Sequence, residues 1–67
     1  MNSHEIGMII KERRSFLNIK QSDLAEIAGV GERTLREIEK GIANPELNNL
    51  LRICEVLGLE LKIDVKQ

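Results

Sequence analysis

The sequence predicts a mainly α-helical domain of four short helices followed by a single β-strand. Three observations lead to this fold class. Apolar residues recur at helical spacing as far as Leu57, glycines stand where helices should end, and the last segment alternates between apolar and polar residues. We therefore expect a single domain over residues 1–67. Its helices should span about 3–17, 21–28, 32–40 and 46–57, and its strand about 59–65.

The first helix is predicted from a capping residue and an apolar face. Ser3 can accept a hydrogen bond at the helix start, and Glu5 places a negative charge near the positive end of the helix dipole. Asn18 tolerates a left-handed backbone and is a plausible terminator. The apolar face is expected to contain Ile6, Ile9, Ile10 and Leu17.

The second and third helices are short and are separated by a glycine. Gly29 adopts a positive φ at little cost and should end the second helix. Gly31 occupies the N-cap of the third helix, where Ser or Thr would cap better, and Gly41 closes that helix. The expected inner residues are Leu24, Ala25 and Ala28 on the second helix and Leu35 and Ile38 on the third.

The fourth helix and the strand complete the chain. Pro45 permits a helix start just after it, and Gly58 should stop this helix. The inward residues are expected to be Leu47, Leu50, Leu51, Cys54 and Leu57. The strand residues Leu59, Leu61, Ile63 and Val65 alternate with charged residues, as in a half-buried strand. A lone strand needs a hydrogen-bonding partner, so we expect the same strand of a second subunit to supply it.

Composition excludes several classes of protein. No cofactor or metal is predicted, because His4 is the only histidine and no ligand-spaced Cys or His accompanies it. No nucleophile–base pair or phosphate-binding glycine loop is visible, so we do not expect an enzyme. Cys54 has no partner for an internal disulfide and is expected to be a buried thiol. With no signal peptide and no apolar run of about 20 residues, the expected location is the cytoplasm, without a membrane partner.

The charge balance gives no support to nucleic-acid binding by itself. The net charge is −1 and the pI is about 5.8, whereas neutralisation of phosphates usually supplies non-specific affinity for DNA. The charges are mixed along the chain, and Lys11, Arg13, Arg14 and Lys20 form a basic cluster. We expect Lys11, Arg13 and Arg52 to be solvated.

The segment from Gln21 to Gly41 nevertheless has the packing pattern of a helix-turn-helix. Ala25 is small where two helices must approach closely, and Gly29 follows four residues later at the turn. Leu35 and Ile38 are placed to bury the inner face of the second helix of the unit. Such a helix is free to enter the major groove of DNA.

On these residues the chain resembles the lambda-repressor-like (Cro/XRE-type) DNA-binding family over roughly residues 10–59. The resemblance is carried by Ile10-Lys-Glu-Arg-Arg14, Gln21, Leu24-Ala25, Ala28-Gly29-Val30, Thr34-Leu35, Ile38-Glu39-Lys-Gly41, Asn44-Pro45 and Leu57-Gly58. It implies a transcriptional repressor that binds double-stranded DNA as a homodimer on a palindromic operator. It places Glu32, Arg33, Arg36 and Glu37 at base edges. It places Lys20, Gln21, Thr34, Lys40 and Asn44 near the DNA backbone, and it pairs Arg14 with Glu39 as a structural ion pair.

The C-terminal strand narrows the resemblance to HipB-type antitoxins, in which such strands join two subunits. This implies an autoregulating antitoxin with a HipA-like kinase toxin as partner. Two alternatives stay open: a phage or mobile-element repressor without a toxin, and a protein-interaction module that no longer binds DNA. Arg33 and Arg36 have a structural alternative too, as partners of Glu37 and Glu39 on their own helix. For Glu32 and Glu37, base contact and plain solvation are both open.

Overall fold

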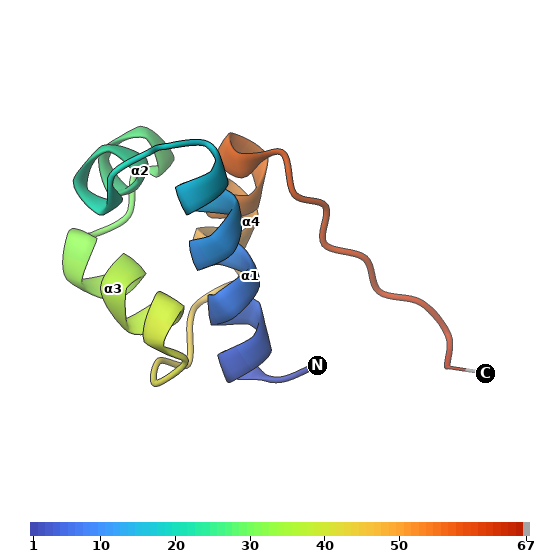
Figure 1. Cartoon of the computed structure of the whole chain (residues 1–67). Coiled ribbons are helices and arrows are strands. Elements are labelled where there is room, and N and C mark those ends of the chain that lie inside the picture. Colours follow the sequence, from blue (N-terminus) through green and yellow to red (C-terminus); the bar gives the residue numbers. More distant parts are fainter. Residues whose placement is uncertain (67) are drawn as a thin grey trace.

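The computed structural model describes residues 1–66, which form four α-helices and an extended C-terminal tail (Figure 1). The predicted domain extends to Gln67, which lies outside the described residues. The helices are α1 (Ser3–Phe16), α2 (Gln21–Ala28), α3 (Glu32–Lys40) and α4 (Leu47–Leu57). The second and third helices have the same bounds as expected from the sequence, and the first and fourth differ from the expected bounds by a single residue at one end. None of these helices is long and apolar enough to cross a membrane.

The N-cap of helix α1 lies one residue before the predicted cap, Ser3. Asn2 is the N-cap, and its Oδ1 accepts a hydrogen bond from the backbone N–H of Glu5 at 2.9 Å. Ser3 is already helical, so the prediction that it caps the helix was wrong. After Phe16 the chain turns through Asn18, whose φ of 59° is the left-handed conformation expected of a terminator.

A glycine makes the turn between α2 and α3 possible. Gly29 has φ 72° and ψ 32°, and the N–H of the following Val30 bonds to the carbonyl of Ala25 at 3.0 Å. Gly31 is the N-cap of α3 and supplies no side-chain hydrogen bond, as its lack of a side chain dictates. The turn therefore relies on backbone hydrogen bonds and on Val30 packed against the core.

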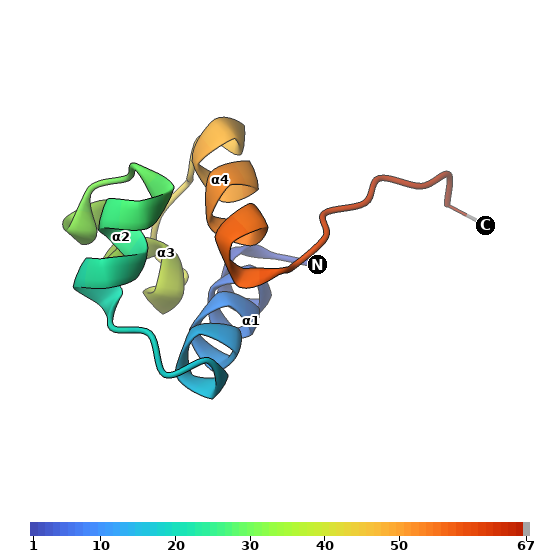
Figure 2. The same ribbon diagram turned by 90° about the horizontal axis from the view of Figure 1, so that it is seen from above.

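The core lies where all four helices meet. Helix α1 packs against α3 and α4, and α2 packs against the same two helices from the other side (Figures 1 and 2). The buried apolar residues are Ile10, Leu24, Ala25, Ala28, Leu35, Ile38, Leu50, Ile53 and Leu57. The predicted inner faces of α2 and α3 are thus confirmed.

The predicted inner faces of α1 and α4 were partly wrong. Ile53, which was not expected inside, is fully buried, whereas Leu47 and Leu51 are exposed. Ile9 is also exposed, and Cys54 is only half-buried. Both helices carry more apolar residues than one packing face can hold, so the surplus lies on the surface.

Gly7 brings α1 and α3 unusually close together. A Cβ atom at this position would lie 2.3 Å from the carbonyl oxygen of Ile38 and 2.9 Å from that of Glu39. These are backbone atoms at the end of α3, which cannot move aside as a flexible side chain could. The closeness of the two helices therefore depends on the missing side chain of Gly7.

The predicted strand over 59–65 is not formed by the single chain. Residues 59–66 contain no strand and run away from the helices (Figure 1). Ile63 and Val65 are 92% and 91% exposed. An extended segment becomes a strand only when another strand takes up its backbone hydrogen bonds, and no other extended segment lies beside it among residues 1–66.

Candidate nucleic-acid interface

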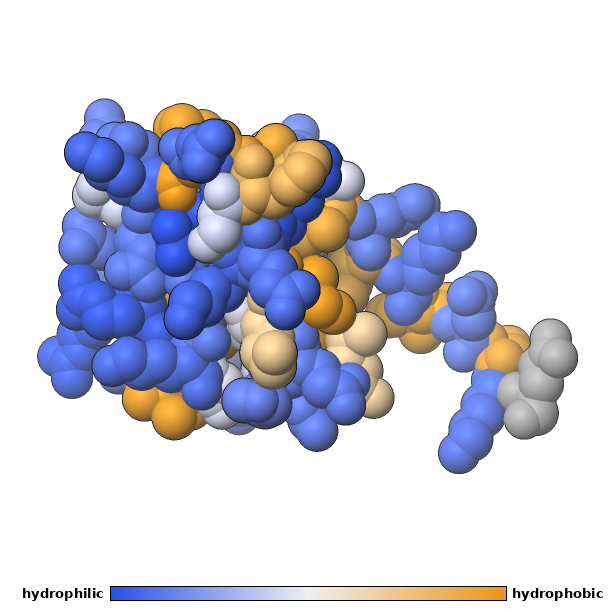
Figure 3. All heavy atoms as spheres, in the orientation of Figure 1, coloured by the Kyte–Doolittle hydropathy of each residue, from blue (hydrophilic) through white to orange (hydrophobic). Residues whose placement is uncertain are grey.

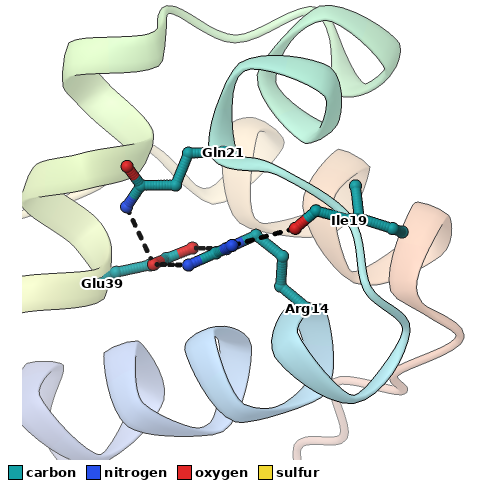
Figure 4. A network of polar contacts seen from close by, with 4 residues as sticks. All are labelled: Arg14, Ile19, Gln21 and Glu39. Carbon is teal, nitrogen blue, oxygen red and sulfur yellow. Dashed lines mark hydrogen bonds and ion pairs between the residues drawn. The ribbon is translucent and has the colours of Figure 1, made fainter.

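An ion pair in the interior fixes the orientation of α3 against α1. Arg14 donates from Nε to Oε2 of Glu39 at 2.7 Å and from Nη2 to Oε1 at 2.9 Å (Figure 4). The Arg14 side chain is 14% exposed and that of Glu39 only 2%. This paired geometry matches the planar fork of a guanidinium to both oxygens of a carboxylate.

Two further groups complete this network. The third Arg14 donor, Nη1, bonds to the backbone carbonyl of Ile19 at 2.9 Å, and Gln21 donates from Nε2 to Oε1 of Glu39 at 3.0 Å. The hydrogen bond to Glu39 raises the pKa of Arg14, so its guanidinium stays charged. The network therefore joins the end of α1, the start of α2 and the last turn of α3 (Figure 4).

The outer face of α3 carries a stripe of positive charge with an acidic residue on each side. At roughly 3.6 residues per turn, Arg33, Arg36 and Lys40 fall near the middle of the arc opposite Leu35 and Ile38. Glu32 and Glu37 fall at the two edges of this arc. In Figure 3 most of the atoms on the side of the molecule where α3 lies are hydrophilic.

Each arginine on this face is paired with a glutamate of the same helix. Arg36 Nη2 lies 3.0 Å from Glu32 Oε2, and Arg33 Nε lies 3.7 Å from Glu37 Oε2. The expected local pair of Arg36 with Glu39 is not formed, because Glu39 is turned inward to Arg14. All four side chains are at least 40% exposed, so water weakens both pairs and other partners can compete for them.

The residues expected near a DNA backbone lie at helix ends and in a loop. Lys20 precedes α2, Lys40 ends α3, and Asn44 lies in the loop before α4; all three are exposed. Gln21 and Thr34 are half-buried. One N–H of the Gln21 side-chain amide already donates to Glu39. The other N–H and the amide oxygen remain for a ligand.

Lys11 shares a hollow with several of these residues, although it was expected to be merely solvated. The hollow has a volume of about 670 Å³ and lies between α1 and α3. Lys11, Gln21, Arg36 and Lys40 line it together with Glu12 and Glu39. Sequence reasoning missed Lys11 because its place beside α3 depends on how α1 crosses α3. The spacing of residues along α1 does not reveal that crossing.

The expectation that Arg13 is solvated was wrong. Its Nε donates to the carbonyl of Leu57 at 2.8 Å, and its guanidinium lies 5.4 Å from the centre of the Phe16 ring. Arg13 therefore serves the C-terminal end of α4, where a positive charge is favourable. Only the tertiary contact between α1 and α4 distinguishes it from the neighbouring Arg14.

The described residues offer no alternative metal or thiol site. Within residues 1–66, no three His, Cys, Asp or Glu side chains are grouped so as to hold a metal ion. Partial burial raises the pKa of the Cys54 thiol, which disfavours the reactive thiolate.

Comparison with known proteins identifies the same region. A helix-turn-helix family model matches residues 10–63. An uncharacterized HTH-type transcriptional regulator of Sinorhizobium fredii, y4mF, is 30% identical over 59 residues, which cover 88% of this chain and 78% of the relative.

Two other relatives come from a phage and a bacterium. The ImmF control region 10 kDa protein of Bacillus phage phi105 is 29% identical over 63 residues, covering 94% of this chain and 70% of the phage protein. An uncharacterized HTH-type transcriptional regulator of Haemophilus influenzae is 40% identical over 58 residues, covering 82% of this chain and 59% of that protein. The matched residues include the whole α2–turn–α3 unit.

Proposed function

Because this chain belongs to the Cro/XRE-type helix-turn-helix family, we propose that it is a sequence-specific DNA-binding repressor that acts as a two-fold dimer. The observation that carries the proposal is the exposed stripe of Arg33, Arg36 and Lys40 on α3. The inner side of this helix is anchored to α1 and α2 by hydrogen bonds to Glu39. A helix that reads bases must present its side chains in a defined direction, and the Arg14–Glu39–Gln21 network supplies that direction. The relatives named as transcriptional regulators and as a phage control-region protein support the same function.

In this proposal α3 lies in the major groove. Arg33 and Arg36 reach base edges, where arginine binds O6 and N7 of guanine through two hydrogen bonds. Lys20, Gln21, Thr34, Lys40 and Asn44 flank the groove and contact phosphates, which orient the protein without reading sequence. RNA polymerase is then excluded from the promoter by occupation of the operator.

The two-fold dimer is proposed to form through the tail. Residues 59–65 alternate in polarity, and Leu59 is the last residue whose backbone N–H is bonded within the described part of the chain. An apolar groove of about 380 Å³ lies between α1, α4 and the start of the tail, lined among others by Ile6, Ile9, Cys54 and Leu61. Apolar atoms are visible where the tail leaves the helices (Figure 3). Pairing of two tails would satisfy their backbone groups and cover this surface, with recognition helices about 34 Å apart on the DNA.

Removal of the tail should abolish the dimer. We expect a chain lacking residues 61–67 to sediment as a monomer at concentrations at which the full chain is a dimer. Loss of the second half-site should also weaken operator binding by at least about a hundredfold, since linked sites reinforce each other by roughly that factor or more.

The two faces of the tail provide a matched control. Changing Ile63→Ser and Val65→Ser should dissociate the dimer, because two of the four apolar side chains of that face are lost. Changing Lys62→Ser and Asp64→Ser alters the opposite face and should leave the dimer intact. A dimer that persists without residues 61–67 would show that the tail is not the interface.

Binding to the DNA upstream of the protein's own gene tests the repressor function. We expect a gel shift whose affinity falls steeply as salt is raised, because contacts to phosphates release counterions. Arg36→Ala should reduce affinity by about 1–3 kcal/mol and relax selectivity at one base position. The complete absence of salt-sensitive DNA binding would reject the repressor and favour a protein-interaction module.

Whether the repressor also binds a toxin protein is a separate question from whether it binds DNA. The pattern of the tail is the sole support for an antitoxin with a HipA-like kinase toxin, whereas the similarity to a phage control-region protein favours a repressor without a toxin. Co-expression with the product of the neighbouring gene and purification of the complex distinguishes the two. A stoichiometric complex supports the antitoxin, and recovery of the repressor alone supports the stand-alone regulator.

A further inference from the structure

The arginines of the recognition helix are not free cations. Arg36 is joined to Glu32 by a hydrogen bond of 3.0 Å, and Arg33 lies 3.7 Å from Glu37. Both pairs are spaced four residues apart and lie on the exposed face. The five charged residues of this face therefore sum to a charge of only +1, from Arg33, Arg36 and Lys40 against Glu32 and Glu37.

This pairing has a cost when the helix meets DNA. A glutamate beside a phosphate is repelled, and an arginine drawn to a phosphate leaves its glutamate behind in the groove without a partner. A contact to a phosphate therefore gives the arginine of each pair a new partner but leaves the glutamate without one. The arrangement disfavours non-specific binding.

A G·C base pair, by contrast, can satisfy both members of a pair. In the major groove guanine presents two acceptors, N7 and O6, which suit an arginine, and cytosine presents the N4 amino group, a donor that suits a carboxylate. An A·T pair presents a single amino group and acceptors, together with the methyl group of thymine, and offers arginine no such adjacent pair of acceptors. An arginine and a glutamate held side by side are thus complementary to the adjacent edges of guanine and cytosine.

We infer that the pairs Arg36–Glu32 and Arg33–Glu37 make α3 selective for G·C base pairs and suppress its binding to other DNA. This inference rests on the proposed function and adds the class of DNA sequence that the repressor takes. Glu32 and Glu37 are then specificity-determining residues, and their carboxylates accept hydrogen bonds from cytosine.

The test is a selection from a duplex library with a randomised central region, performed with the full-length chain. The wild-type chain should enrich duplexes with G·C pairs at fixed positions in each half-site. Glu32→Gln and Glu37→Gln should each reduce the preference for G·C over A·T at one position by about fivefold or more. Each change should also steepen the slope of log affinity against log salt on random duplex by about one, because the released arginine can contact a phosphate.

A matched control is Glu55→Gln, which removes the same charge from an exposed position on α4. It should change neither the enriched sequence nor the salt slope, and circular dichroism should show that all variants are folded. Enrichment of sites without G·C pairs by the wild-type chain would overturn the inference while leaving the repressor intact. Unchanged selectivity in both glutamate variants would overturn it as well. Failure of the wild-type chain to bind any duplex would instead reject the proposed function.

Discussion

Replacing Glu39 by alanine should destabilise the domain by about 3–5 kcal/mol, because it leaves the guanidinium of Arg14 without its carboxylate. The Glu39 side chain is 2% exposed and receives hydrogen bonds from both Arg14 and Gln21, so the truncation breaks the whole network. A domain of this length has a total stability of roughly 3–10 kcal/mol. We therefore expect Glu39→Ala to lose a large part of the free energy of unfolding, as measured by circular dichroism during urea denaturation.

Glu37→Ala on the same helix is the control for this result. Glu37 also pairs with an arginine, but its side chain is 40% exposed and its partner Arg33 86% exposed, so the change should cost at most about 1 kcal/mol. The double change Arg14→Met and Glu39→Leu should recover much of the lost stability, because it removes both charges together. A cost below about 1 kcal/mol for Glu39→Ala would contradict the structural role of the ion pair.

Gly7→Ala should lower the free energy of unfolding by about 3 kcal/mol, which is at the upper end of the usual cost of overpacking. The added methyl group would lie 2.3 Å from the carbonyl oxygen of Ile38, so α1 and α3 would have to separate. Separation would also loosen the contact between Arg14 and Glu39 and tilt the recognition helix. Urea denaturation measures the stability, and a gel shift measures the accompanying loss of DNA affinity.

The sign of this effect distinguishes a clash from helix propensity. In a helix without a close neighbour, glycine to alanine is stabilising by up to about 1 kcal/mol. Ser15→Ala, at an exposed position of the same helix, serves as the control and should change stability by less than about 0.5 kcal/mol. Stabilisation by Gly7→Ala would show that α1 and α3 are not in close contact in solution.

The sequence by itself determined the features that depend on a few neighbouring residues. Gly29 and Asn18 marked turns because a left-handed backbone is strained for most side chains. Leu35 and Ile38 identified the inner side of α3, since a short helix with two apolar residues has only one face to bury. The helix-turn-helix could be predicted for the same reason: its signature lies within Gln21–Gly41.

The tertiary structure decided whatever depends on how separate elements cross. Ile9 and Leu51 continue apolar faces, and only the packing of α1 on α4 shows that they lie outside while Ile53 lies inside. Arg13 and Arg14 are adjacent in the sequence, yet one reaches the end of α4 and the other a carboxylate of α3. The close contact at Gly7 could not be predicted from its neighbours in the sequence, because the atoms that require a glycine there belong to the backbone of α3. Alternation from Leu59 to Val65 describes which side chains share a face, but a strand needs a partner for its backbone, and a single chain does not supply one within its described residues.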